Sequence, residues 1–147
     1  MTKITPSGKE CLLLFVCLAN EVRGRTRLQK EIYLCKEEKG AQIPYPFVPY
    51  SYGPFSFEIW NDLEELCVAG LIAEEEMSFT LFGGETGTQY IYRITDEGRR
   101  TVKKRIMPKV EQELIRKMKD VIRKYNKKDL TTILRNVYQH FLLGGQL

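Results

Sequence analysis

Two short stretches decide the fold, Met77-Ser-Phe-Thr-Leu81 and Tyr90-Ile-Tyr-Arg-Ile-Thr-Asp-Glu-Gly98. In the first stretch apolar and polar residues alternate, and in the second Tyr90, Tyr92 and Ile94 occupy every second position, which is typical of β-strands with two different faces. The glycine-rich residues 83–87 between them predict a hairpin turn. Thr95 can then cap a helix, because the two acids that follow it would lie near the positive end of the helix dipole.

Three helices are predicted before this hairpin. Gly8 and Gly70 flank a region in which apolar residues recur at helical spacing. The first helix is opened by Ser7-Gly8, covers Lys9–Val22 and is stopped by Gly24. The second is capped by Thr26, continues to Lys39 and is ended by Gly40. The third is capped by Ser56 and ended by Gly70, and its inward residues are Ile59, Trp60, Leu63, Leu66 and Cys67. Four prolines in residues 41–54 exclude a helix there and predict an extended connection.

The order helix, helix, helix, hairpin, helix predicts a winged helix-turn-helix with a long proline-rich insert between helices 2 and 3. The fold class is mainly α with a small β-hairpin (α+β). After Pro108, two extra C-terminal helices are expected, the second capped by Asp129. We therefore divide the chain into a winged-helix domain, residues 1–107, and a C-terminal helical appendage, residues 108–147, packed on the core or used for dimerisation. The stripe that would serve either role is Leu114, Met118, Val121 and Tyr125.

Charge is divided unevenly along the chain. Residues 1–98 hold 9 Lys/Arg against 15 Asp/Glu, whereas residues 99–147 hold 14 against 4, which together give the net charge of +4. No Lys or Arg occurs between Lys39 and Arg93. Two surfaces with different partners are therefore expected.

Basic residues in two segments are candidates for binding nucleic acid. One segment is the start of the second helix and the other is the fifth helix, and phosphate contacts supply most of the affinity of such sites. The candidates are Arg25, Arg27, Lys30, Arg116, Lys117, Lys119, Arg123 and Lys124. The alternative is a solvated helix face without a partner.

The third helix and the loop before it are candidates for binding a protein. Four acids and no base on the exposed side of this helix would repel a DNA duplex, so ordinary major-groove docking is disfavoured. Seven of the 16 aromatic residues lie between Tyr45 and Trp60, where no Lys or Arg accompanies them. They can seal the loop against the core or anchor a partner, since Tyr and Trp dominate interface hot spots. The candidates are Tyr50, Tyr52, Phe55, Glu58, Asp62 and Glu65.

No motif for catalysis, a cofactor or a metal is found. The four cysteines lie in apolar helical patterns and the chain has one histidine, so reduced buried thiols are expected and no zinc site. The longest apolar run, Cys11–Ala19, is too short to span a membrane, and a signal peptide pattern is missing. A cytoplasmic protein without enzyme activity is expected.

Several segments together resemble the Panacea-type antitoxin proteins and related prokaryotic winged-helix proteins of unknown function. They are Arg25-Thr-Arg-Leu-Gln-Lys with Tyr33, Pro49-Tyr-Ser-Tyr-Gly-Pro-Phe-Ser, Asp62-Leu-Glu-Glu-Leu with Gly70-Leu-Ile, Tyr92-Arg-Ile-Thr-Asp-Glu-Gly, and Leu134-Arg-Asn-Val-Tyr. The resemblance implies a small regulator or antitoxin-like adaptor without catalytic residues. The chain departs from the family pattern at Phe141-Leu-Leu-Gly, where the family continues with tyrosine and proline.

These observations predict a non-catalytic regulator or antitoxin-like adaptor. Its acidic third-helix and hairpin face, with the Tyr-Gly-Pro loop, would contact a protein, and its basic C-terminal helices would contact nucleic acid or an acidic partner. The alternative is a sequence-specific DNA-binding repressor that acts as a dimer. A third hypothesis is an enzyme subunit.

Overall fold

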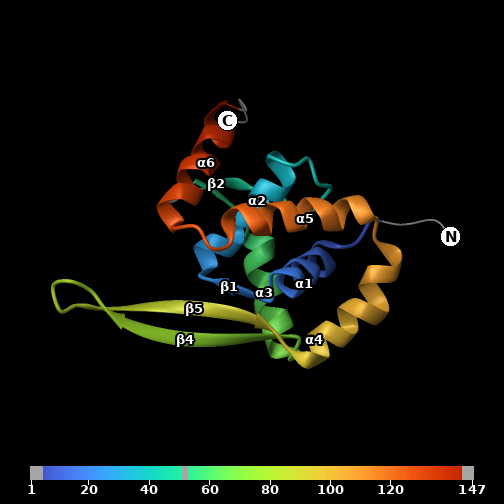
Figure 1. Ribbon diagram of the computed structural model, residues 1–147, viewed down its shortest axis with the longest axis horizontal. Coiled ribbons are helices and arrows are strands. Elements are labelled where there is room, and N and C mark those ends of the chain that lie inside the picture. Colours follow the sequence, from blue (N-terminus) through green and yellow to red (C-terminus); the bar gives the residue numbers. More distant parts are fainter. Residues whose placement is uncertain (1–4, 51–52, 144–147) are drawn as a thin grey trace.

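The computed structural model describes residues 5–50 and 53–143 (Figure 1). It is an α+β structure with two small antiparallel sheets. The elements are α1 Gly8–Ala19, β1 Glu21–Arg23, α2 Arg25–Glu37, β2 Val48–Tyr50, β3 Gly53–Phe55, α3 Phe57–Val68, β4 Ile72–Thr80, β5 Thr86–Ile94, α4 Asp96–Thr101, a π-helical turn Val102–Ile106, a 3-10 turn Met107–Lys109, α5 Gln112–Tyr125 and α6 Leu130–Leu143. Within the described residues, no helix has the length and apolar character needed to cross a membrane.

Helix α1 lies at the centre of the core. Ser7 and Glu10 form a reciprocal capping box at its N-terminus, and six consecutive residues, Cys11–Val16, are buried. The predicted end of this helix was wrong. Asn20, with φ of 68°, ends α1, and the chain turns into β1 instead of continuing to Val22.

A three-stranded sheet with the strand order β1-β5-β4 packs beside α1. Glu21 of β1 pairs with Arg93 of β5, and Ile72 of β4 pairs with Ile94 of β5, so β5 is the central strand. The predicted hairpin is therefore confirmed and is longer than expected. It extends far beyond the helices as a free arm (Figure 1).

The proline-rich connection forms a small ribbon of β2 and β3, as the extended prediction indicates. Pro49 lies opposite Pro54 in this ribbon. Neither residue has an N–H, so the pair fits the position at which antiparallel strands exchange no hydrogen bonds. A proline on β2 also leaves that open edge without a donor for an added strand.

The predicted caps of α3 and α4 are confirmed. The Ser56 hydroxyl accepts from the Ile59 N–H, and the Thr95 hydroxyl accepts from the Gly98 N–H. Gly70, with a φ of 78°, directly follows Ala69, the C-cap residue of α3. The Thr26 cap was wrong, because α2 begins one residue earlier and Gly24 precedes it without a side-chain cap.

Helices α5 and α6 pack on α1 and α2. In the stripe predicted for α5, Met118, Val121 and Tyr125 are buried in the same cluster as α1, and Leu114 packs against it. This stripe is therefore covered by the chain itself and is not open to a second copy. The oligomeric state and the division at residue 107 stay predictions.

Candidate functional site

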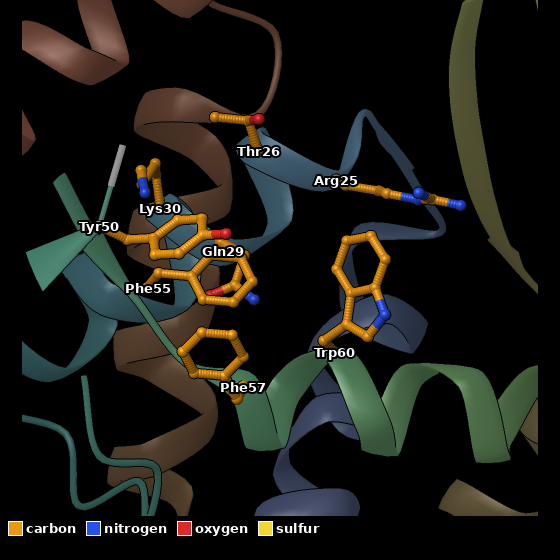
Figure 2. A pocket seen from close by; sticks show the side chains of 8 residues that line it. All are labelled: Arg25, Thr26, Gln29, Lys30, Tyr50, Phe55, Phe57 and Trp60. Carbon is orange, nitrogen blue, oxygen red and sulfur yellow. The ribbon is translucent and has the colours of Figure 1, made fainter. Parts of the chain in front are cut away.

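A pocket of about 400 Å³ opens between α2, the β2–β3 ribbon and α3 (Figure 2). It brings together candidates that the sequence placed in two separate groups. Arg25 and Lys30 were expected to meet nucleic acid, and Tyr50 and Phe55 to meet protein. The residues that line it are Arg25, Thr26, Gln29, Lys30, Tyr50, Phe55, Phe57 and Trp60.

Helix α2 holds the other two walls of the pocket in place. The Gln29 side-chain amide donates to the Ser56 carbonyl at 2.9 Å and accepts from the Ser56 N–H at 3.0 Å. Both residues are buried. The Lys30 ammonium donates to the Pro54 carbonyl at 2.5 Å. These contacts fix the start of α3 and the end of β3 to one face of α2.

The aromatic side of the pocket is a cluster of rings that remains open to solvent. Phe55 lies 5.0 Å from Tyr50 and 4.9 Å from Phe57, measured between ring centroids. Tyr50 and Phe57 are each 56% exposed, and Trp60 is 40% exposed. Such rings lose little entropy and offer large flat faces to a ligand.

Lys30 is the buried cation of the pocket. Its side chain is 2% exposed, and burial lowers the pKa of its ammonium to about 8. Among the described residues, the Pro54 carbonyl is its hydrogen-bond acceptor, and no carboxylate neutralises it. Because an unpaired buried charge is costly, an anion that reached the pocket would gain a strong partner. The sequence placed Lys30 among the basic candidates at the start of the second helix, and in the structure its side chain lies in the wall of the pocket.

Arg25 occupies the rim beside Trp60. Its guanidinium lies 4.5 Å from the centroid of the Trp60 ring and 3.9 Å from that of Tyr90. Its Nε donates to the Tyr92 hydroxyl at 2.9 Å, and Tyr92 in turn donates to Glu74. Two rings and a hydroxyl therefore hold the arginine in one orientation, with part of its surface exposed.

Two further hollows continue from the pocket along the start of α2. The first shares Arg25 and Thr26 with the pocket, and the second shares Arg23 and Arg27 with the first and reaches Lys127. The Arg27 guanidinium donates to the carbonyls of Tyr125 and Asn126, so the fold does bring the start of α2 to the end of α5.

The basic candidates of α5 are mostly engaged within the chain. Arg116 pairs with Glu113 and Asp120, and Arg123 also pairs with Asp120. Lys124 pairs with Glu38 at 3.2 Å, and Lys117 donates to the Gly40 carbonyl. Lys119 is exposed. The charge that this helix offers to a partner is therefore smaller than the sequence suggests.

Among the acidic candidates of α3, some are likewise engaged within the chain and one is exposed. Glu58 is exposed, whereas Asp62 is half-buried and accepts from the Tyr45 hydroxyl at 2.6 Å. Glu65 pairs with Lys9. Glu64, which was not among the candidates, is exposed on the same helix. Tyr52 lies outside the described residues.

Four lining residues of the pocket were missed or misplaced, and one of them, Thr26, was predicted only as a helix cap. Trp60 was expected inward on α3, but it faces the pocket (Figure 2). Phe57 was one of the seven aromatic residues between Tyr45 and Trp60 but was not chosen as a candidate, and Gln29 was not singled out. The sequence offers one signal for Phe57, since it directly follows the Ser56 cap and so lies on the first turn of α3. Tyr45, by contrast, is buried, and Phe47 packs edge-on against Tyr33, so these two rings seal the loop.

The fold and this site together define a small α+β protein with a surface pocket of aromatic rings and cations. Within residues 5–50 and 53–143, no group of three His, Cys, Asp or Glu side chains could hold a metal ion. The chain is similar to the uncharacterized protein YwgA of Bacillus subtilis (strain 168), with 34% identity over 85 residues. That match covers 54% of this chain and 45% of YwgA, so the chain spans about half the length of this relative. No protein-family model and no solved structure matches the chain.

Proposed function

We propose that this protein is a non-catalytic winged-helix regulator that acts as an adaptor and binds a protein through its acidic side. The order α1-β1-α2-α3-β4-β5, with the β2–β3 ribbon inserted between α2 and α3, supports a winged helix in which the β4–β5 hairpin is the wing. The strand order β1-β5-β4 supports the same fold. In this assignment α3 takes the place of the recognition helix.

The observation that carries the proposal is the charge on the exposed side of α3. Glu58 and Glu64 are exposed there, as is Glu65, which pairs with Lys9, and no Lys or Arg belongs to α3. Phosphate contacts need cations, so a DNA duplex would be repelled from the position that a recognition helix normally occupies. A basic protein surface would be attracted to the same position.

The hairpin supplies apolar contacts beside these acids. Met77 and Phe79 on β4, and Leu81 directly after it, are each nearly half-exposed, and Phe82 at the tip is fully exposed. Glu74, Glu75 and Glu76 precede them on the same strand. An exposed apolar group with an acidic border is typical of a protein interaction site. We therefore propose a partner protein whose binding surface is basic and contains an apolar pocket.

The resemblance to the Panacea-type antitoxins favours the same class of function, in which a small protein neutralises or recruits another. The alternative, a dimeric DNA-binding repressor, has less support. The predicted dimer stripe on α5 is buried, and most candidate cations of that helix are paired within the chain.

A capture experiment with matched variants tests the proposal. The full chain, the variants Glu64→Lys and Phe82→Ser, and the control Glu37→Lys, an acid on α2, are each immobilised and exposed to lysate of the source cells. We expect one protein that the wild type and the control retain equally and that both variants lose at least tenfold. Equal retention of every captured protein by all four chains would contradict the proposal.

A further inference from the structure

We infer that the aromatic pocket and the arginines next to it form a binding site for single-stranded nucleic acid. This inference goes beyond the proposed adaptor function and does not use the acidic face of α3 or the hairpin tip. It gives Tyr50 and Phe55 a different partner from the one that the sequence predicts.

The first argument is the arrangement of the rings. Proteins bind single strands by stacking bases on exposed aromatic side chains next to positive charge. Tyr50, Phe57 and Trp60 keep open faces around one hollow, and Phe55 packs behind them. The pocket of about 400 Å³ is within the size range of pockets for small planar ligands.

The second argument is charge. The sequence from Tyr45 to Trp60 contains no Lys or Arg, which by itself disfavours base stacking. The fold supplies both cations from α2, Arg25 at the rim and Lys30 at the wall. None of the lining residues is acidic, but Glu74 just outside the pocket lies 3.6 Å from the Arg25 guanidinium and offsets part of its charge. A phosphate beside a stacked base would meet Lys30, whose ammonium has no carboxylate partner among the described residues.

The third argument is that the positive charge continues outside the pocket. The next two hollows are lined by Arg23 and Arg27. The second one is also lined by Lys127 and by Glu21, which pairs with Arg23 at 2.7 Å, so Arg27 and Lys127 carry most of this charge. Within residues 5–50 and 53–143, the hydrogen-bond acceptors of Arg27 are the carbonyl oxygens of Arg23, Tyr125 and Asn126, and no acid forms an ion pair with it. The backbone of a strand whose base lies in the pocket can follow this row of arginines.

The same geometry disfavours a duplex. Stacking in the pocket requires a base that is splayed out of its own stack. A second strand would lie close to Glu64 and Glu74, which line a hollow that shares Arg25 and Trp60 with the pocket. Repulsion by these carboxylates makes the single strand the preferred ligand.

The test uses Trp60, the one tryptophan of the chain, as a reporter of the pocket. The full chain is titrated with oligothymidylate and oligouridylate of about 12 nucleotides, and with a duplex of the same length, at low and moderate salt. We expect both single strands to quench the Trp60 fluorescence, to bind at least tenfold more tightly than the duplex, and to weaken as salt rises.

Variants then locate the site by the anisotropy of a labelled oligothymidylate. Phe57→Ala and Arg25→Gln each change a partly exposed side chain and should weaken binding about 5- to 150-fold, the range measured for the loss of one stacked base. Arg100→Gln on α4 and Leu142→Ala on α6 are the charge and apolar controls and should leave affinity unchanged.

Three outcomes would overturn the inference. They are no binding of either single strand at low salt, equal binding of single strand and duplex, and equal loss of affinity in the control variants. Quenching of Trp60 by the captured partner protein, with no quenching by any oligonucleotide, would assign the pocket to protein instead.

Discussion

Glu31 on α2 is fully buried, and neither carboxylate oxygen has a hydrogen-bond partner among the described residues. Burial raises the pKa of this carboxyl to about 8, although the charge of Arg27 acts in the opposite direction. The folded protein therefore holds a proton that the unfolded chain releases above its ordinary pKa of 4.5. The stability from this group is complete below pH 4.5 and is lost as the pH rises through about 8.

The Glu31→Gln variant tests this linkage because glutamine cannot ionise. We expect the unfolding free energy of the wild type to fall between pH 5 and pH 8.5 by up to about 5 kcal/mol more than that of the variant. Urea denaturation at the two pH values measures the difference. Parallel pH dependence in the two proteins would show that Glu31 is ionised in the folded state.

Gly98 shows why the Thr-Asp-Glu-Gly sequence follows the hairpin. A Cβ atom at this position would collide with the Leu71 carbonyl and crowd the Ile94 side chain. The Gly98 N–H also donates to the Thr95 cap at 2.9 Å. Glycine at this position therefore lets α4 start directly against the root of β4.

Gly98→Ala should lower the unfolding free energy by about 1–3 kcal/mol, the usual cost of overpacking. Gly83→Ala at the hairpin tip is the control, because a Cβ there meets only the end of the Glu85 side chain. Thermal denaturation followed by circular dichroism compares the two variants. Equal melting temperatures would mean that the close approach to Leu71 relaxes without cost.

At the scale of the elements, most features that depend on neighbouring residues in the sequence were predicted correctly. Features that depend on contacts between distant residues were not. Ser56 and Thr95 were identified as caps because a cap depends on its own side chain and the next three residues. Strand β1 was read as the end of a helix because Val22 is apolar and its partner, Tyr92, is far away in the sequence. The pocket was missed for the same reason, since its cations and its rings come from different elements.

Gln29 is the contact that joins two of these elements. It satisfies both the N–H and the carbonyl of buried Ser56. Gln29→Leu leaves these groups without that partner and should cost about 2–4 kcal/mol of unfolding free energy. Urea denaturation measures this loss, and the position of the Trp60 emission maximum reports whether the start of α3 moves. The control is Gln139→Leu, which changes an exposed side chain of α6. An equal effect of both substitutions would contradict the role given to Gln29.

At the scale of the whole molecule, the last two helices complete the core. Val110, Ile115, Val121, Ile133 and Val137 belong to the same buried cluster as α1 and α2. The sequence predicted these helices from their apolar stripes, but it could not decide between packing on the core and dimerisation. Both alternatives bury the same stripe, so the periodicity of the residues does not separate them.

A fragment of residues 1–107 tests how far the core depends on these helices. Without residues 108–147, the apolar surface of α1 and α2 would be exposed to water, which costs about 25 cal/mol per Å². We expect the fragment to lack a cooperative thermal transition by circular dichroism. A sharp transition near that of the full chain would instead support the division into two domains at residue 107.

The central proposal concerns the charge of one face: we propose that the outward side of α3 binds protein and not DNA. The most direct measurement is a titration of a labelled random-sequence DNA duplex at low salt with the wild type and with Asn61→Ala, which changes an exposed residue of that side. We predict weak binding that is the same for both chains, because the carboxylates of α3 keep the duplex away. Tight binding by the wild type that Asn61→Ala weakens about tenfold or more would contradict the account and place α3 in the major groove.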